Sequence, residues 1–218
     1  MKKTISLATL KRVVKESGFR WKRMRRCLRG KRDPELFRDC GQILKIYQSL
    51  EDKGEIDLFY GDESCFSLVP NVPYGWQKET IRIPSAKSQN VKILGFLSRK
   101  GELVSYEIEG KMDSEIMISC IDDFAKTLKK KTILVLDNAS IHTSGKMQKE
   151  MARWKKEYQL EIDFLPPYSP ELNLIEILWR KMKYDFIPLN AYETFSKLRE
   201  SVKSILLEYT QKYRITFA

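Results

Sequence analysis

The stretch TILVLDNASIHTS, residues 132–144, sets a carboxylate directly after a strand of the buried type. Its apolar and β-branched run, residues 133–136, is typical of a strand inside a sheet. Asp137 and Asn138 follow at once, and His142, the only histidine of the chain, lies five residues beyond the aspartate. Taken alone, Asp137 fits either a turn that ends the strand or a carboxylate placed for chemistry.

The segments around this strand predict a mixed α/β fold, in which helices flank a central sheet. Apolar and alternating runs predict further strands over residues 55–70 (with a bend near Gly61), 77–84, 91–101, 102–110 and 160–167. Helical spacing of apolar residues predicts helices over residues 6–17, 34–53, 113–129, 144–158 and 193–209. Another helix is predicted from Ser169 to Phe186, with Ser169 as its N-cap and Pro170 in its first turn.

Positive charge is concentrated at the N-terminus. The net charge is +11, and residues 1–50 hold 15 of the 40 Lys and Arg but only 4 of the 29 Asp and Glu, so the rest of the chain is balanced. We therefore predict two parts, a basic helical segment with a linker helix over residues 1–54 that contacts DNA, and a main domain over residues 55–218. A solvated helical surface is the alternative interpretation of this charge.

The residues predicted to contact DNA interleave cations with an aromatic ring, which suits a phosphate backbone. They are Arg20, Trp21, Lys22, Arg23, Arg25, Arg26, Arg29, Lys31 and Arg32. No apolar run is long enough to span a membrane, so no membrane partner is expected. The four cysteines are scattered, and with a single histidine they argue against a zinc site and for reduced thiols in the cytoplasm.

Three acidic residues occupy positions that an apolar core would not select. Asp62 lies within the first long strand, Asp137 ends the strand at 132–136, and Glu176 sits on the helix that follows the prolines at 166–170. Each has a structural alternative, respectively a bulge, a turn and a half-exposed helix position. Together they favour a shared site, because buried carboxylates are costly unless they are paired or bound to metal. Glu171 points away from Glu176 by helical periodicity and is not expected to join them.

Three oxygen ligands without Cys or His favour Mg²⁺ or Mn²⁺. Two such ions about 3.5–4 Å apart can activate a nucleophile and stabilise the leaving oxygen of a phosphodiester. A basic segment next to an acidic metal site therefore predicts an enzyme that cleaves or joins nucleic acid.

Three blocks of the sequence resemble the signatures of mariner-like transposases, specifically the bacterial insertion sequence 630 branch. The blocks are YGDESCFSLVPNVPYGW at 60–76, ILVLDNASIHTS at 133–144 and FLPPYSPELNLIEILWRKMK at 164–183. The resemblance covers about residues 55–190, and 38 residues separate Asp137 from Glu176. It implies a ribonuclease H-like fold in which Asp62, Asp137 and Glu176 form a DDE triad that holds two Mg²⁺ or Mn²⁺ ions, with Asp62 bridging them.

The same resemblance implies the reaction and its partners. The enzyme would cleave DNA at the terminal inverted repeats of an element and transfer the freed 3′-OH into target DNA, at TA dinucleotides. A homodimer is expected, because two element ends must be held together. Members of this family generally carry N-terminal helix-turn-helix units, and this chain begins where that region should be ending, so we expect an upstream helix-turn-helix polypeptide to assist end recognition.

Several residues keep two interpretations. Asn138 and His142 are predicted to support the metal ligands or contact DNA, with a structural histidine as the alternative for His142. Tyr74 and Trp76 either stack on DNA or, more in keeping with their type, anchor a loop, while Trp179 is predicted to be core. Two other functions stay open, a catalytically silent DNA-binding remnant and a ribonuclease H-like nuclease or integrase outside the transposases.

Overall fold

The computed structural model of the chain describes residues 5–19, 29–69, 71, 89–138, 145–209, 211–213 and 215. The chain divides into two compact units, Met1–Gly30 and Lys31–Ala218. Helix α1 (Leu7–Glu16) belongs to the first unit, and the Ser6 hydroxyl caps it by accepting from the Thr9 backbone N–H at 3.1 Å. The predicted linker helix, α2 (Pro34–Asp52), belongs to the second unit, where Leu44 packs in the core.

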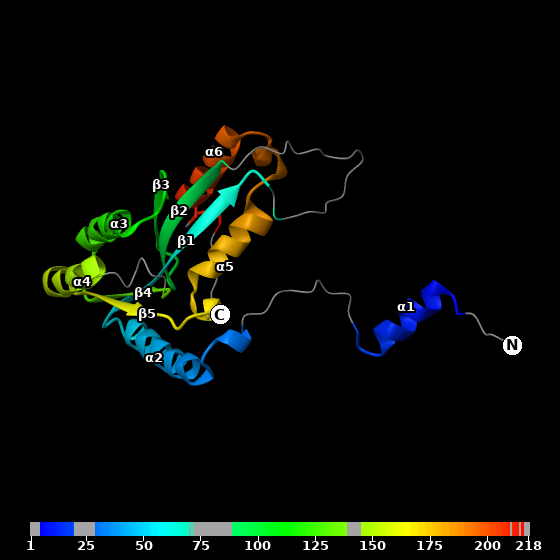
Figure 1. Cartoon of the computed structure of the whole chain (residues 1–218), viewed down its shortest axis with the longest axis horizontal. Helices are drawn as coiled ribbons and strands as arrows, with labels where there is room; N and C mark the ends of the chain where they lie inside the picture. Colours follow the sequence, from blue (N-terminus) through cyan, green and yellow to red (C-terminus); the bar gives the residue numbers. More distant parts are fainter. Residues whose placement is uncertain are drawn as a thin grey trace. The chain divides into compact units, whose positions relative to one another are not determined.

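The sheet of the second unit has five strands in the order β3-β2-β1-β4-β5 (Figure 1). Strands β1 (Asp57–Ser67), β2 (Asn90–Ser98) and β3 (Leu103–Ile108) form an antiparallel meander. Strands β4 (Thr132–Leu136) and β5 (Leu160–Phe164) run parallel to β1. The mixed sheet therefore brings β1 and β4, which carry two of the three predicted carboxylates, side by side at its centre.

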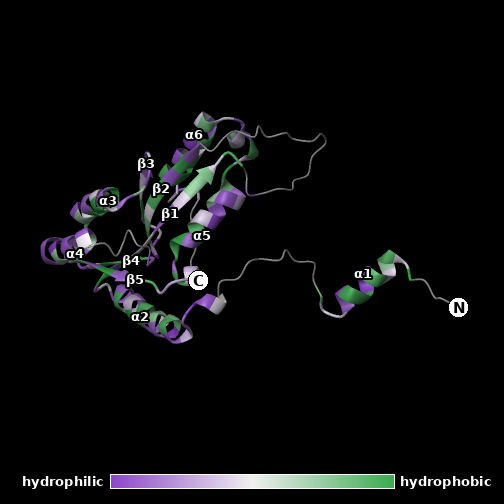
Figure 2. Ribbon diagram, in the orientation of Figure 1, coloured by the Kyte–Doolittle hydropathy of each residue, from purple (hydrophilic) through white to green (hydrophobic). Residues whose placement is uncertain are grey.

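Helices cover both faces of this sheet. On one face lie α2, α5 (Ile175–Lys181) and α6 (Phe195–Leu207), packed with Leu58 of β1 and Val135 of β4. On the other face lie α3 (Ser114–Thr127) and α4 (Gly145–Tyr158), packed with Leu94 of β2 and Leu134 of β4. The helices carry both polar and apolar residues, as expected when one side of each helix meets the sheet (Figure 2). The predicted α/β class with flanking helices is confirmed.

Strand β1 is continuous at Gly61, so the predicted bend is wrong. A side chain at Gly61 would be too close to its neighbours, because a Cβ built there lies 2.6 Å from Leu136 Cδ2 and 2.9 Å from Phe96 Cδ1. The glycine therefore serves close packing rather than a turn.

The helix predicted from Ser169 is also interrupted. A short 3₁₀ turn spans Pro170–Leu172, α5 begins only at Ile175, and a π-helical segment follows over Met182–Phe186. Ser169 makes no capping hydrogen bond with its side chain. The break occurs at Asn173, whose backbone is extended and whose side-chain amide donates to the Gly61 carbonyl of β1 at 3.1 Å.

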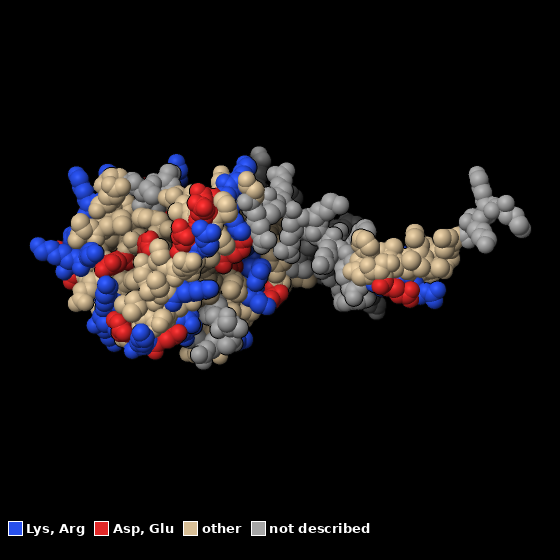
Figure 3. Space-filling view, turned by 90° about the horizontal axis from the view of Figure 1, so that it is seen from below, with Lys and Arg blue, Asp and Glu red and all other residues tan. Residues whose placement is uncertain are grey.

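Further predictions concern the strand at residues 77–84, membrane spans, the cysteines and the distribution of charge. The strand expected over residues 77–84 lies outside the described residues. Where the chain is described, no helix is long and apolar enough to cross a bilayer, and Cys40, Cys65 and Cys120 are free thiols. Figure 3 shows Lys, Arg, Asp and Glu interspersed on one face of the second unit, in line with the balanced charge expected for the residues after 50.

Candidate active site

Asp62 lies in the middle of β1 on the face covered by α5. Its partner across the antiparallel pair with β2 is Gly95, and its neighbour Glu63 is exposed, as strand alternation requires. Burial raises the pKa of Asp62 to about 7, and the negative charges of Glu176, Asp137 and Glu63 add to the increase, whereas a backbone hydrogen bond from Glu63 opposes it. Asp62 therefore keeps its proton to a higher pH than a solvent-exposed aspartate does.

Asp137 follows the last residue of β4. Strands β1 and β4 are parallel, and Tyr60 pairs with Val135. Two residues further along each strand come Asp62 and Asp137, so the register brings both carboxylates to the same level and the same face. Placement at the end of a fully buried strand explains why the apolar run leads directly into the aspartate.

Glu176 lies in the first turn of α5. Ile175 and Trp179 of the same helix pack closely on the sheet. Gly95 permits this approach, because a Cβ built there would lie 2.8 Å from Trp179 Cη2 and 2.9 Å from Ile175 Cδ1. Trp179 is 2% exposed, so its predicted core position is confirmed. Because Gly95, opposite Asp62, has no side chain, α5 approaches the sheet closely and places Glu176 near Asp62.

Burial raises the pKa of Glu176, and the charge of Asp137 raises it further. Lys183 and Arg180 act in the opposite direction. These cations follow Glu176 by seven and four residues, which places them along the same side of the helical segment. Sequence reasoning did not select them, although their spacing from the glutamate was visible.

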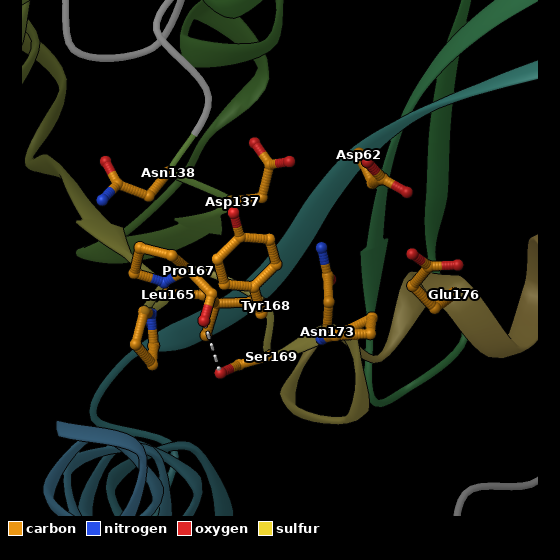
Figure 4. Close-up of a pocket in the computed structure, with 11 residues that line it drawn as sticks. Asp62, Asp137, Asn138, Leu165, Pro167, Tyr168, Ser169, Asn173 and Glu176 are labelled. Carbon is orange, nitrogen blue, oxygen red and sulfur yellow. Dashed lines mark hydrogen bonds between the residues drawn. The ribbon is translucent and has the colours of Figure 1, made fainter. Parts of the chain in front are cut away.

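The three carboxylates line one pocket of about 390 Å³ (Figure 4). The other lining residues are Asn138 and most of the loop that precedes α5, namely Leu165, Pro166, Pro167, Tyr168, Ser169, Pro170 and Asn173. Asn138, predicted to support the ligands or contact DNA, is thus beside Asp137. Tyr168 and Asn173 were not selected as site residues, since nothing in their spacing indicates that this loop folds over the ends of β1 and β4.

Glu171 lies outside this lining, as expected, and pairs instead with Arg32 at 3.4 Å. Arg32 also lies over the Phe37 ring, 3.8 Å from its centroid, and the Lys31 ammonium lies 5.9 Å from the centroid of the Tyr168 ring. The remaining predicted DNA contacts at residues 20–26, the Arg29 side chain, Tyr74, Trp76 and His142 lie outside what the structure describes.

The donor set of the pocket fits a hard divalent cation. Its charged groups are all carboxylates, and among the residues that the structure describes neither His nor Cys lines it. As the side chains are placed, no three acidic, Cys or His groups among the described residues converge on one point that could hold an ion. The charges of Glu176 and Asp137 add to the effect of burial in raising the pKa of Asp62, and a cation bound there would offset them.

Comparison with known proteins places the chain in a family. Residues 57–199 match the family described as DDE superfamily endonuclease. A 39 kDa protein of insertion element IS630 from Shigella sonnei is 26% identical over 213 residues, which cover 92% of this chain and 60% of that protein. The chain therefore spans about three fifths of the length of this curated relative.

Solved structures of the Mos1 mariner transposase share the fold. Its strand transfer complex matches at a TM-score of 0.59 and 16% identity, covering 93% of this chain and 63% of that one. Its catalytic domain matches at a TM-score of 0.51 and 13% identity, covering 86% and 85%. The ribonuclease H-like fold and the resemblance to mariner-like and insertion sequence 630 transposases, both predicted from the sequence, are confirmed.

Proposed function

Because the chain belongs to the DDE superfamily of endonucleases, we propose that it is the catalytic part of a transposase. It would cleave DNA strands at the terminal inverted repeats of an insertion element and transfer the freed 3′-OH into target DNA, at TA dinucleotides. The observation that carries the proposal is that Asp62 of β1, Asp137 at the end of β4 and Glu176 of α5 line one pocket.

In this proposal Asp62, Asp137 and Glu176 would hold two Mg²⁺ or Mn²⁺ ions. The ions would activate the attacking oxygen and stabilise the leaving oxygen of the phosphodiester. The raised pKa values of Asp62 and Glu176 support this role, because burial, their main cause, and the charge of Asp137 both disfavour the ionised carboxylates, and a bound cation would offset that effect. Asn138, on the pocket wall, and His142 would support the ligands or contact the DNA.

Positive charge near the pocket supports binding of a DNA backbone. Arg180 and Lys183 continue the helical side that carries Glu176, and both lower the pKa of that glutamate. The basic residues 20–32 would add phosphate contacts. A homodimer would hold two element ends, and helix-turn-helix units would recognise them. A bacterial cytoplasm, in which free thiols such as Cys40 and Cys65 stay reduced, is the proposed location.

A cleavage assay on supercoiled plasmid that carries the ends of the encoding element tests the proposal. We expect nicked and linear products with Mg²⁺ or Mn²⁺, none with a chelator, and recovery when the ion is restored. Asp62→Asn, Asp137→Asn and Glu176→Gln should each lower the rate more than about a hundredfold, since changes outside the ligands already cost 10–100-fold in metal sites.

Glu102→Gln is the matched control, because Glu102 is exposed and does not line the pocket. Its rate should stay within about twofold of the wild type. DNA binding without any cleavage would favour the silent DNA-binding remnant. If Asp137→Asn cleaves DNA as fast as the wild type, Asp137 is not a metal ligand of the site.

A further inference from the structure

The loop from Leu165 to Asn173 is fastened at both ends beside the carboxylates. The backbone N–H of Leu165 donates to the carbonyl of Leu136, the residue before the aspartate of β4, at 2.8 Å. At the other end, the Asn173 amide donates to the carbonyl of Gly61, the residue before the aspartate of β1. Three residues of the loop are proline, which fixes their φ angles. The loop is therefore a stiff support attached to both aspartate-bearing strands.

Tyr168 adopts an uncommon backbone conformation within this support. Its φ is 60°, and Gln159 is the only other non-glycine residue with positive φ in the part of the chain that the structure describes. A bulky aromatic residue in this region is strained, and such strain persists where the surroundings impose it. The next residue, Ser169, is 4% exposed and its hydroxyl donates to the Pro167 carbonyl, so the loop turns inward immediately after the tyrosine.

The Tyr168 side chain is 46% exposed although it lines the pocket. Figure 4 shows its ring among the other lining residues, with Asn138 on one side and Asn173 on the other. A core role does not account for a strained, half-exposed ring at this place. The Lys31 ammonium, 5.9 Å from the ring centroid, adds positive charge beside it.

An exposed aromatic ring next to a cation is the combination that binds unpaired nucleotides, because the ring stacks on a base while the cation attracts the backbone. We propose that Tyr168 forms a stacking subsite for the nucleobase next to the phosphate that occupies the carboxylate pocket. The inference rests on the proposed function for the identity of that phosphate. The strained backbone serves to hold the ring at the pocket rather than in the core.

Binding of DNA with and without the base tests this subsite. The probe is a nicked duplex of the element end, either intact or with one abasic nucleotide on the 5′ or the 3′ side of the nick, and Ca²⁺ replaces Mg²⁺ so that binding is read without cleavage. On intact DNA, Tyr168→Leu should weaken binding by about fivefold or more, the lower end of base stacking, and Tyr168→Phe by less than about twofold. On one of the two abasic probes, Tyr168→Leu should bind as well as the wild type.

Tyr168→Gly separates stacking from packing, since glycine adopts positive φ without strain. Its melting temperature should be no lower than that of the wild type, and its affinity for intact DNA should fall by as much as that of Tyr168→Leu. Equal losses for Tyr168→Leu on intact and on both abasic probes, or a lower melting temperature of Tyr168→Gly together with its loss of binding, would overturn the subsite. A wild type that binds but cleaves no DNA would reject the proposed function, whereas the stacking subsite is judged on these binding ratios.

Discussion

At the residue scale, the ionisation of Asp62 links the stability of the protein to its site. Its pKa is raised from 3.8 to about 7, mainly by burial and then by the charge of Glu176. An acid whose pKa is higher in the folded state binds its proton more tightly there than in the unfolded chain. Stability from this group is therefore present below the unfolded pKa and is lost as pH rises toward the folded pKa.

Asp62→Asn should accordingly stabilise the metal-free protein, and increasingly so from pH 4 to pH 8. The shift from 3.8 to about 7 corresponds to an upper limit of about 4 kcal/mol above pH 7, and to little difference near pH 4. Urea unfolding of both proteins in the presence of a chelator, at a series of pH values, measures this difference in the free energy of unfolding. Added Mg²⁺ should stabilise the wild type and leave Asp62→Asn nearly unaffected. A stability difference that shrinks as pH rises would contradict the assignment.

At the element scale, the site depends on how closely α5 approaches the sheet. Gly95 of β2 lies opposite Asp62, and the absence of a side chain there lets Ile175 and Trp179 of α5 pack against the strand. This contact fixes the position of Glu176, because Glu176 is the residue after Ile175. A glycine that is unremarkable in a strand sequence thus sets the spacing between two of the three carboxylates.

Gly95→Ala should lower the free energy of unfolding by about 1–3 kcal/mol, as overpacking of a core does, and should reduce cleavage further by displacing α5. Thermal unfolding and the plasmid assay measure the two effects. Gly41→Ala is the matched control, since Gly41 lies within α2 with nothing near its Cβ position. That variant should gain about 0.5–1 kcal/mol and keep its activity. An active and stable Gly95→Ala would show that this close approach is not needed.

At the scale of the whole molecule, the chain divides into two compact units that differ in charge and in content. The first unit, Met1–Gly30, contains most of the residues predicted to contact DNA, and the second, Lys31–Ala218, contains the pocket. The core of the second unit is formed by its own sheet and helices. We therefore expect the fold of the second unit not to require the first unit, and we propose that its affinity for DNA does.

Removal of residues 1–30 should leave the unfolding of the second unit nearly unchanged and weaken DNA binding. Each phosphate contact that is lost should reduce the slope of log K against log salt concentration by about 0.9. Fluorescence anisotropy across a salt series measures that slope. An unchanged slope would mean that the basic charge of the first unit is solvated surface, the alternative interpretation of its composition.

The sequence by itself determined the α/β class and the chemical type of the site. The apolar segments that contain Asp62 and end in Asp137 predict two strands, and the segment around Glu176 predicts a helix. The three acidic residues predict a buried cluster, because burial of charge needs a compensating partner. Local patterns carry this information, since they depend on residues that are close along the chain. The resemblance of the three blocks supplied the ribonuclease H-like fold.

Only the tertiary structure decided how the site is assembled. The helix predicted from Ser169 breaks at Asn173, because the Asn173 amide bonds to Gly61, more than a hundred residues earlier in the chain. The same long-range contact turns the preceding loop into a wall of the pocket and leaves Tyr168 strained at its rim. Such features depend on pairs of residues far apart in sequence, and no periodicity or local preference records them.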